Sequence, residues 1–217
     1  MASAVGEAED EKAAKILRFL VEDSIKLSMN GNIVLIGFMG AKKSSLGYWL
    51  AKRLGVSFVD TQAYIEDRTN RIISTLSPME RPYNAIERER GIIETIANYS
   101  GFVVACDMKI AADEYSMTKI KNSGFVVWMD CGMDTAMERA SGRYPLNAMN
   151  PAQREQYYRH YEEIFRHYAD MVFNTSGDED HYSLHIMLHQ LHYQLYNELQ
   201  KRREAHGRRR QSGFRWA

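Results

Sequence analysis

The stretch IVLIGFMGAKKSS at residues 33–45 decides the fold of this chain. Its four leading apolar residues are typical of a buried strand, and the pattern G-x-x-x-x-G-K-[ST] after a strand describes a loop whose backbone N–H groups wrap a phosphate. The pattern begins at Gly37, and Lys43 and Ser44 occupy its cation and hydroxyl positions. Lys42 stands where the pattern has its second glycine. The sequence therefore predicts a nucleotide-binding loop that is altered where the phosphate is held.

The composition is that of a soluble globular protein. The 217 residues are enough for one sizeable domain, and 45% hydrophobic and 26% charged residues are ordinary values. Lys+Arg and Asp+Glu both number 28, so no net charge draws the chain to nucleic acid or to an anionic membrane. Cys106 and Cys131 have no C-x-x-C spacing, and we interpret them as buried core residues in a reducing compartment. Without a secretory signal or an apolar run of roughly 18 residues, the sequence predicts a cytoplasmic protein with no membrane partner.

Short apolar runs alternate along the chain with segments of helical period. The runs predict strands at residues 32–36, 56–60, 102–105, 125–130 and 171–174. The periodic segments predict helices at residues 10–28, 43–54, 63–68, 84–97, 134–140, 151–169 and 182–203. This alternation is typical of an α/β fold, a five-stranded parallel sheet with helices on both faces. Ligands of such sheets bind at the carboxyl ends of the strands, and this edge carries the loop at 37–45, Asp60, residues 106–109 and the loop after Asp130.

Further short stretches carry a resemblance to a known family. They are IGFMGA at residues 36–41, Lys43-Ser44, LAKRLGVSFVDT at 50–61, AYIE at 63–66 and MVFNTSG at 171–177. Together they resemble the shikimate kinases. The resemblance implies a P-loop NTPase fold of the nucleoside-monophosphate-kinase type, with a mobile lid. It also implies a transferase of aromatic amino-acid biosynthesis, which moves the γ-phosphoryl of ATP to a hydroxyl of shikimate with Mg²⁺ as cofactor.

The resemblance assigns the nucleotide side of the site to the loop and its surroundings. The nucleotide-binding positions are Gly37, Gly40, Lys42, Lys43, Ser44 and Ser45. Phosphoryl transfer needs neutralised charge and a metal; Lys43 can neutralise phosphate oxygens, and Ser44 and Asp60 match the metal side of the family's site. Arg143, in a stretch similar to the family's lid, is identified as a second catalytic cation. The alternative is that Arg143 is a solvated loop arginine.

Lys42 leaves two interpretations open. Glycine in such a loop allows backbone conformations that a side chain resists, so a left-handed lysine would strain the loop by about 1–2 kcal/mol. The lysine charge could instead add a contact to a phosphate. Of the two, we expect weakened nucleotide binding.

The substrate side of the pocket departs from the family at its matched positions. These degenerate positions are Gln62, Asn84, Asp107, Met108, Lys109 and Tyr161. In that order they replace a carboxylate that holds the substrate hydroxyls, an arginine that grips the substrate carboxylate, three glycines and a second substrate arginine. Each lost charge-assisted contact is worth about 1.5–3 kcal/mol, so several together would reduce shikimate binding by orders of magnitude.

We expect the chain to have three parts. Residues 1–30 are an N-terminal extension with an amphipathic helix, residues 31–200 a shikimate-kinase-like domain, and residues 201–217 a basic, disordered tail. Arginines interleaved with Phe214 and Trp216 would suit phosphate backbones and bases. A solvated terminus is the simpler interpretation, so we do not expect a nucleic-acid partner.

The sequence therefore predicts a shikimate-kinase-like protein whose activity on shikimate is impaired or lost. One alternative is a non-catalytic pseudokinase, a regulatory protein that binds a nucleotide or a protein partner. Another is a kinase for a different small hydroxyl substrate. An interaction module acting through the two terminal segments has the least support.

Overall fold

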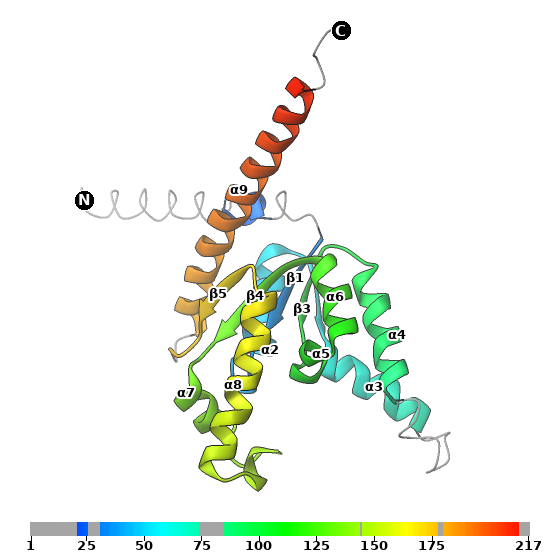
Figure 1. The fold of residues 1–217 in the computed structure, drawn as a ribbon, viewed down its shortest axis with the longest axis vertical. Helices are drawn as coiled ribbons and strands as arrows, with labels where there is room; N and C mark the ends of the chain where they lie inside the picture. The colour runs from blue at the N-terminus through cyan, green and yellow to red at the C-terminus, as the bar shows by residue number, and fades with distance from the viewer. Residues whose placement is uncertain (1–20, 26–30, 74–84, 144, 178–179, 213–217) are drawn as a thin grey trace, which may run out of the picture. The chain divides into compact units, whose positions relative to one another are not determined.

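The computed structural model describes residues 21–25, 31–73, 85–143, 145–177 and 180–212 (Figure 1). The chain divides into two compact units, one spanning Asn30–Leu184 and the other joining Met1–Met29 to His185–Ala217. All strands of the sheet belong to the first unit. The limits predicted above for an extension, a domain and a tail stay a prediction.

Five parallel strands form one sheet at the centre of the first unit. They are β1 (Asn32–Ile36), β2 (Ser57–Asp60), β3 (Phe102–Ala105), β4 (Gly124–Asp130) and β5 (Met171–Asn174), in the order β2-β3-β1-β4-β5. The strand positions read from the apolar runs are confirmed. β1 is the middle strand and is buried along its whole length, which explains why it reads as an uninterrupted apolar run.

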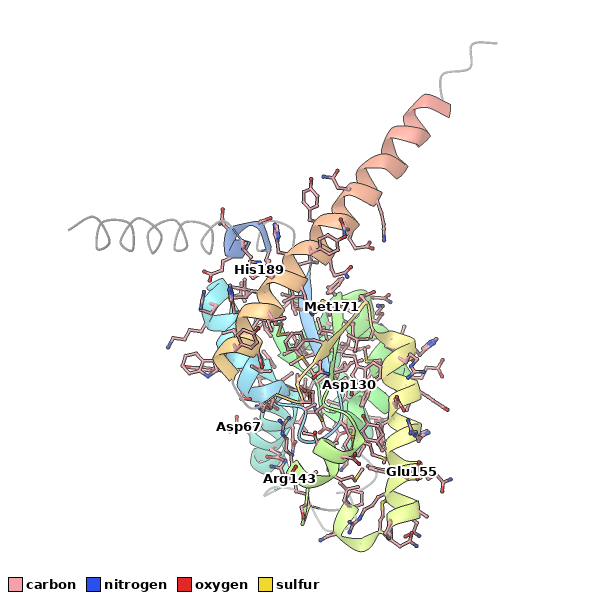
Figure 2. The ribbon with its side chains drawn as sticks, turned by 90° about the vertical axis from the view of Figure 1, so that its left-hand side faces the viewer. Asp67, Asp130, Arg143, Glu155, Met171 and His189 are labelled. Atoms are coloured by element: carbon pink, nitrogen blue, oxygen red, sulfur yellow. The ribbon has the colours of Figure 1, made fainter. Side chains whose placement is uncertain are left out.

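Helices cover both faces of the sheet, as predicted. Figure 2 shows α2 (Lys43–Leu54), drawn in cyan, on one side of the strands and α8 (Pro151–Tyr168), drawn in yellow-green, on the other. Helix α8 begins with a capping box, in which Asn150 and Gln153 each bond the other's backbone N–H. The remaining predicted helices of this unit are present as α3 (Thr61–Ile73), α4 (Ala85–Ala97) and α7 (Met133–Arg139).

The last helix is longer than predicted. Helix α9 spans Asp180–Ser212, so the predicted end at residue 203 was wrong. Its side chains pair locally, as Lys201 does with Glu198 one turn earlier. Of the helix predicted at residues 10–28, the described part, residues 21–25, is helical, and the remainder lies outside the described residues.

Two helices between β3 and β4 were not predicted. Helix α5 (Met108–Ala112) begins at Asp107, whose Oδ1 accepts a hydrogen bond from Lys109 N at 2.8 Å. Helix α6 (Glu114–Asn122) begins at Asp113, whose Oδ2 accepts one from Ser116 N at 3.0 Å. Aspartate is among the best residues for this position, because its carboxylate satisfies backbone N–H groups that the first turn leaves unpaired.

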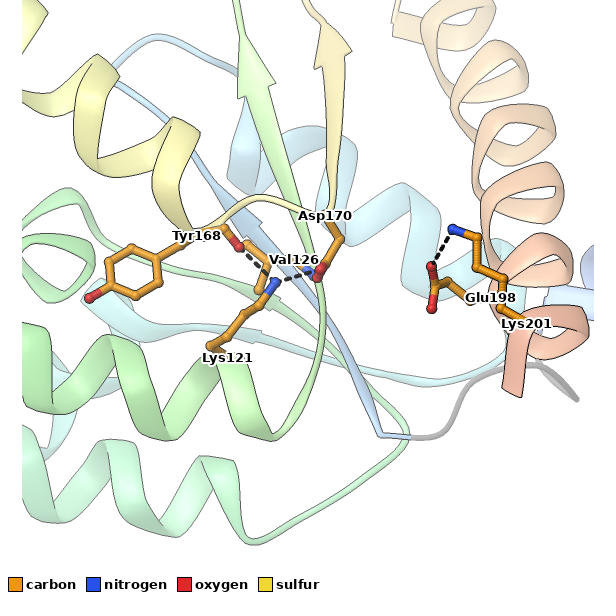
Figure 3. Close-up of polar contacts among 6 residues, drawn as sticks. All are labelled: Lys121, Val126, Tyr168, Asp170, Glu198 and Lys201. Atoms are coloured by element: carbon orange, nitrogen blue, oxygen red, sulfur yellow. Dashed lines mark hydrogen bonds and ion pairs between the residues drawn. The ribbon is translucent and has the colours of Figure 1, made fainter. Parts of the chain in front are cut away.

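Strand β5 is fixed to its neighbours by a charged side chain at its start (Figure 3). Asp170 Oδ2 accepts a hydrogen bond from Val126 N at 2.8 Å, and Asp170 Oδ1 lies 2.5 Å from Lys121 Nζ. The same ammonium donates to Tyr168 O at 2.8 Å. Lys121 of α6 thus fixes the end of α8 and the start of β5 at the same place, which sets the register of the edge strand.

We predict opposite effects on stability for alanine at two glycines of ordinary backbone conformation. A Cβ at Gly124 would meet the backbone oxygen of Asn32 at 1.9 Å, so Gly124→Ala should destabilise the protein by about 2 kcal/mol or more. A Cβ at Gly91, exposed on α4, would meet nothing within 4 Å, so Gly91→Ala should stabilise it by about 0.5–1 kcal/mol through helix propensity. Urea unfolding of both variants measures this, and a stabilising Gly124→Ala would contradict the packing at β1 and β4.

The ion pair between Arg90 and Asp113 predicts a pH dependence of stability. Its hydrogen bond is the main reason why the pKa of Asp113 is lowered to about 2, whereas an unfolded aspartate titrates at about 3.9. This stabilisation is therefore fully present above about pH 4 and is lost as the pH falls towards about 2. Arg90→Gln should flatten the fall in unfolding free energy over this range, as followed by urea unfolding.

Arg159→Gln is the matched control for that experiment, because it also removes an arginine from an ion pair, but one formed with Glu162 of the same helix and not with Asp113. It should leave the acid slope unchanged. If Arg90→Gln has the slope of the unmodified protein, the pair does not contribute as described.

Candidate functional site

The phosphate-binding loop joins β1 to α2, and its backbone takes conformations at two positions that favour glycine. Gly37 has φ 150° and Gly40 has φ 86°, both positive. A Cβ at Gly37 would lie 2.4 Å from Met129 O, and a Cβ at Gly40 would lie 2.9 Å from Arg139 Cβ. The loop therefore passes close to β4 and α7, and neither glycine can be replaced without moving it.

Lys42 adopts the conformation that a glycine would have there. It has φ 57° and ψ 23°, and within the described residues it is the one non-glycine residue with positive φ. Such a conformation is unfavourable for a lysine. Its Nζ donates to Gly177 O at 2.9 Å, in the segment after β5. The backbone of Lys42 thus has the left-handed conformation that the first interpretation expected. Its ammonium contacts a backbone carbonyl of the protein.

Lys43 is held inside the loop by the loop's own carbonyl groups. Its Nζ donates to Gly37 O at 2.7 Å and to Phe38 O at 3.0 Å. Burial lowers the pKa of Lys43, while the carboxylates of Asp107 and Asp60 act in the opposite direction. A phosphate wrapped by the loop would bring negative charge to this ammonium and favour its charged form.

Ser44 and Asp60, which the sequence predicts to be the metal side of the site, are hydrogen-bonded to each other. Ser44 Oγ donates to Asp60 Oδ2 at 2.5 Å, and Asp60 Oδ1 accepts hydrogen bonds from Gln62 N and Ala63 N at the start of α3. A hydroxyl beside a carboxylate suits Mg²⁺, which takes one or two protein oxygens and completes its octahedron with phosphates and water. The described residues contain no cluster of three or more acidic, cysteine or histidine side chains that could hold a metal ion.

The ends of β2 and β3 are joined by Thr61, which is fully buried. Its Oγ1 donates to Ala105 O at 3.2 Å and accepts from Asp107 N at 2.8 Å. These two hydrogen bonds of Thr61 fix the backbone of Asp107, which lies two residues beyond the end of β3. The neighbouring Gln62 side chain donates from Nε2 to Glu66 Oε1 at 2.9 Å along α3.

Most predicted site residues lie around one cavity of about 870 Å³. Those that line it are Gly40, Lys42, Lys43, Ser44, Ser45, Asp60, Gln62, Asp107, Met108, Lys109, Arg143 and Tyr161. Gly37 supports the loop from behind and does not line the cavity, and Asn84 lies outside the described residues. Arg143 reaches the cavity from the connection between α7 and α8, where Figure 2 labels it. The fold therefore brings predicted site residues that are far apart in the chain to one cavity.

Arg139, which the sequence analysis did not single out, also lines this cavity. Its guanidinium donates to Thr175 O at 2.8 Å, Ser176 O at 3.0 Å and Gly177 O at 3.3 Å, and more weakly to Gly40 O at 3.4 Å. Arg139 therefore links the phosphate loop to the segment after β5. The available signal was an arginine in the last turn of the helix that follows the β4 edge.

Tyr161 belongs to an aromatic cluster that forms one wall of the cavity. Its ring packs 5.0 Å from that of Tyr157 and 5.9 Å from that of Phe165, with Phe38 of the loop at 6.1 Å. Only 8% of Tyr161 is exposed. This wall offers ring surface and a phenol rather than a cation.

Charge is unevenly distributed along the cavity. Lys42, Lys43 and Arg139 lie at the phosphate loop, and Asp107, Lys109 and Arg143 also line the cavity. Burial raises the pKa of nearby Glu89, Lys109 lowers it, and Asp107 raises it further. The cavity therefore carries negative as well as positive side chains beyond the phosphate loop.

No helix in the described part of the chain is long and apolar enough to cross a membrane. The predicted cytoplasmic location is not addressed by this finding.

Comparison with known proteins identifies the family. The family model described as shikimate kinase matches residues 39–200. The shikimate kinase of Persephonella marina is 31% identical over 148 residues, 67% of this chain and 90% of that protein. That of Moorella thermoacetica is 30% identical over 161 residues, 70% of this chain and 88% of that protein.

Solved structures support the same fold. A shikimate kinase from Acinetobacter baumannii in complex with shikimate matches with a TM-score of 0.62 at 22% identity, covering 74% of this chain and 92% of that one. The enzyme from Aquifex aeolicus matches with a TM-score of 0.62 at 20% identity, covering 74% and 95%. The predicted P-loop, nucleoside-monophosphate-kinase-like fold is confirmed, and the chain belongs to the shikimate kinase family.

Proposed function

We propose that this protein binds a magnesium–nucleotide complex at residues 37–45 and has lost most of the family's ability to phosphorylate shikimate. The observation that carries the proposal is the contrast between the two ends of one cavity. The end formed by the phosphate loop keeps the groups that the chemistry of ATP and Mg²⁺ requires. The opposite end has lost the groups that would hold an anionic acceptor.

The nucleotide end is supported by three features. Lys43 lies within the loop, where it can meet phosphate oxygens, and Ser44 and Asp60 present a hydroxyl and a carboxylate to one metal position. The loop leads into the first turn of α2, where unpaired N–H groups favour anions. In this arrangement the bound nucleotide would supply the phosphoryl group, and the protein would supply charge and positioning.

The acceptor end lacks a cationic clamp at its matched positions. Gln62 is bonded to Glu66, Tyr161 is packed among rings, and Asp107 brings a negative charge. An acceptor carboxylate would find no bidentate partner at these positions and would be repelled by Asp107. A fourth matched position, Asn84, lies outside the described residues. The sequence alone indicates that an arginine of the family's pattern is replaced there.

A second candidate is a non-catalytic nucleotide-binding protein, and Lys42 favours it. A side chain in the left-handed conformation, with its ammonium on Gly177 O, changes the loop where a transferring phosphate is held. Such a change can leave the nucleotide bound but out of line for transfer.

We predict that nucleotide binding depends on Lys43. Mg·ADP at about 100 times its dissociation constant should add about 2.7 kcal/mol to the unfolding free energy and raise the melting midpoint by several degrees. Lys43→Ala should remove this shift, because the phosphates lose their main cation. Adding shikimate to Mg·ADP should give no further shift.

Lys52→Ala is the control, since Lys52 lies on the same helix but contacts the ring of Trp49 instead of the cavity. It should keep the full nucleotide shift. An undiminished shift in Lys43→Ala would place the nucleotide elsewhere, and a further shift with shikimate would contradict the loss of the shikimate pocket.

We predict that Lys42→Gly tightens Mg·ADP binding several-fold. Glycine adopts φ 57° without the cost of about 1–2 kcal/mol that a side chain bears, so the loop can adjust to the phosphates. Titration calorimetry measures the affinity. Lys42→Asn serves as the comparison, because asparagine also tolerates this conformation but lacks the ammonium. If both substitutions weaken binding, the Lys42 charge contacts the nucleotide and the alternative interpretation holds.

A further inference from the structure

The cavity contains a carboxylate that the metal side of the site does not use. Among the described residues that line it, the carboxylates are Asp60 and Asp107. Both oxygens of Asp60 are engaged, Oδ2 with Ser44 and Oδ1 with two backbone N–H groups. Asp107 uses Oδ1 to cap α5, and its Oδ2 has no hydrogen bond within the described part of the chain. Asp107 therefore has an acceptor oxygen available on the cavity side of the sheet.

Asp107 stands on a rigid support. β2 and β3 are neighbours, with Asp60 opposite Ala105 in the register. Asp107 N donates a hydrogen bond to Thr61 Oγ1 at 2.8 Å, and Asp107 Oδ1 accepts one from Lys109 N at 2.8 Å. A carboxylate whose backbone and one oxygen are both fixed can present the other oxygen in a defined direction.

The position of Asp107 is close to the transferring group. Asp107 and Lys43 line the same cavity, because Asp107 follows β3 and β3 pairs with β1, the strand that leads into the phosphate loop. Lys43 is the cation suited to the β- and γ-phosphates of a nucleotide. A carboxylate that shares the cavity with this ammonium can meet a hydroxyl that approaches the γ-phosphate.

The surroundings of Asp107 favour an acceptor without charge. Lys43 and Lys109 are cations that share the cavity with Asp107, and Lys109 is balanced by Asp107 and Glu89. The lining also includes ring and thioether surface from Tyr157, Tyr161, Met108 and Met149, together with the guanidinium of Arg143. Such a pocket can take the apolar face of a ring while a few polar groups orient its hydroxyls.

On the basis of the nucleotide binding proposed above, we propose that Asp107 is the catalytic carboxylate of a phosphotransferase whose acceptor is an uncharged polyhydroxyl compound. The acceptor O–H bond breaks and its proton passes to Asp107 Oδ2. The acceptor oxygen forms a bond to the γ-phosphorus, the bond from that phosphorus to the bridging oxygen breaks, and ADP leaves. Gln62 assists as a neutral hydrogen-bonding group.

The opposing explanation is that Asp107 serves α5 as a helix cap and nothing more. Asp107→Asn separates the two, because asparagine caps a helix about as well as aspartate but cannot take a proton from a hydroxyl. Asp113→Asn is the matched control, since Asp113 caps the next helix in the same way and does not line the cavity.

The experiment measures ADP formation from Mg·ATP with three probes, namely shikimate, its uncharged methyl ester and myo-inositol, and with water alone. Mg·ADP affinity is measured in parallel by calorimetry. We expect an uncharged probe to be phosphorylated at least about tenfold faster than shikimate. Asp107→Asn should lower this turnover about 10²- to 10⁴-fold with unchanged Mg·ADP affinity. Asp113→Asn should keep the turnover.

Each other outcome overturns a distinct statement. Equal turnover in Asp107→Asn and the unmodified protein would leave Asp107 as a helix cap. A preference for shikimate would contradict the uncharged acceptor. No ADP formation with any probe, by protein that binds Mg·ADP, would overturn the catalytic inference and leave the nucleotide-binding proposal standing. If Mg·ADP itself does not bind, the proposed function fails, and this inference fails with it.

Discussion

The parallel pairing of β1 with β3 on one side and β4 on the other is the constraint on which the rest of this molecule depends. Val34 and Leu35 of β1 are fully buried and pair with both neighbours, so the middle strand can neither shift nor twist independently. The carboxyl ends of these strands consequently lie at one edge of the sheet. The phosphate loop, the Asp107 segment and the loop that starts α7 leave from that edge, which brings residues far apart in sequence to one cavity.

The pairing of β1 fixes the fold but does not fix the side chains that line the cavity. Nothing in the packing of β1 requires an arginine at the acceptor end, so that end could change its chemistry while the sheet stayed intact. The positions that the sequence predicts to have changed, such as Gln62 and Lys109, carry side chains that line the cavity at this edge. The position within the loop that changed, Lys42, keeps the backbone conformation of the glycine pattern. A shikimate kinase fold can thus persist with a different acceptor, or with none.

Much of this arrangement was predictable because its signals are local. The strands are short apolar runs, and the loop from Gly37 to Ser44 has a fixed spacing, so the edge of the sheet and its contents follow from the sequence. Helices α5 and α6 were missed, and their evident marks are the capping residues Asp107 and Asp113 rather than a run of apolar residues. Arg139 was missed for a different reason. Its carbonyl partners lie in the segment after β5, and no local pattern indicates a contact between them.

The carbonyl contacts of residues 175–177 have a consequence for the thermodynamics of ligand binding. Arg139 accounts for a hydrogen bond to each of the three carbonyl groups, and Lys42 adds a second one to Gly177. The backbone at the mouth of the phosphate loop has therefore already lost much of its conformational entropy when the protein folds. A ligand that meets this segment has little left to immobilise, so its affinity reflects the contacts it makes and the solvent it displaces rather than the ordering of a loop.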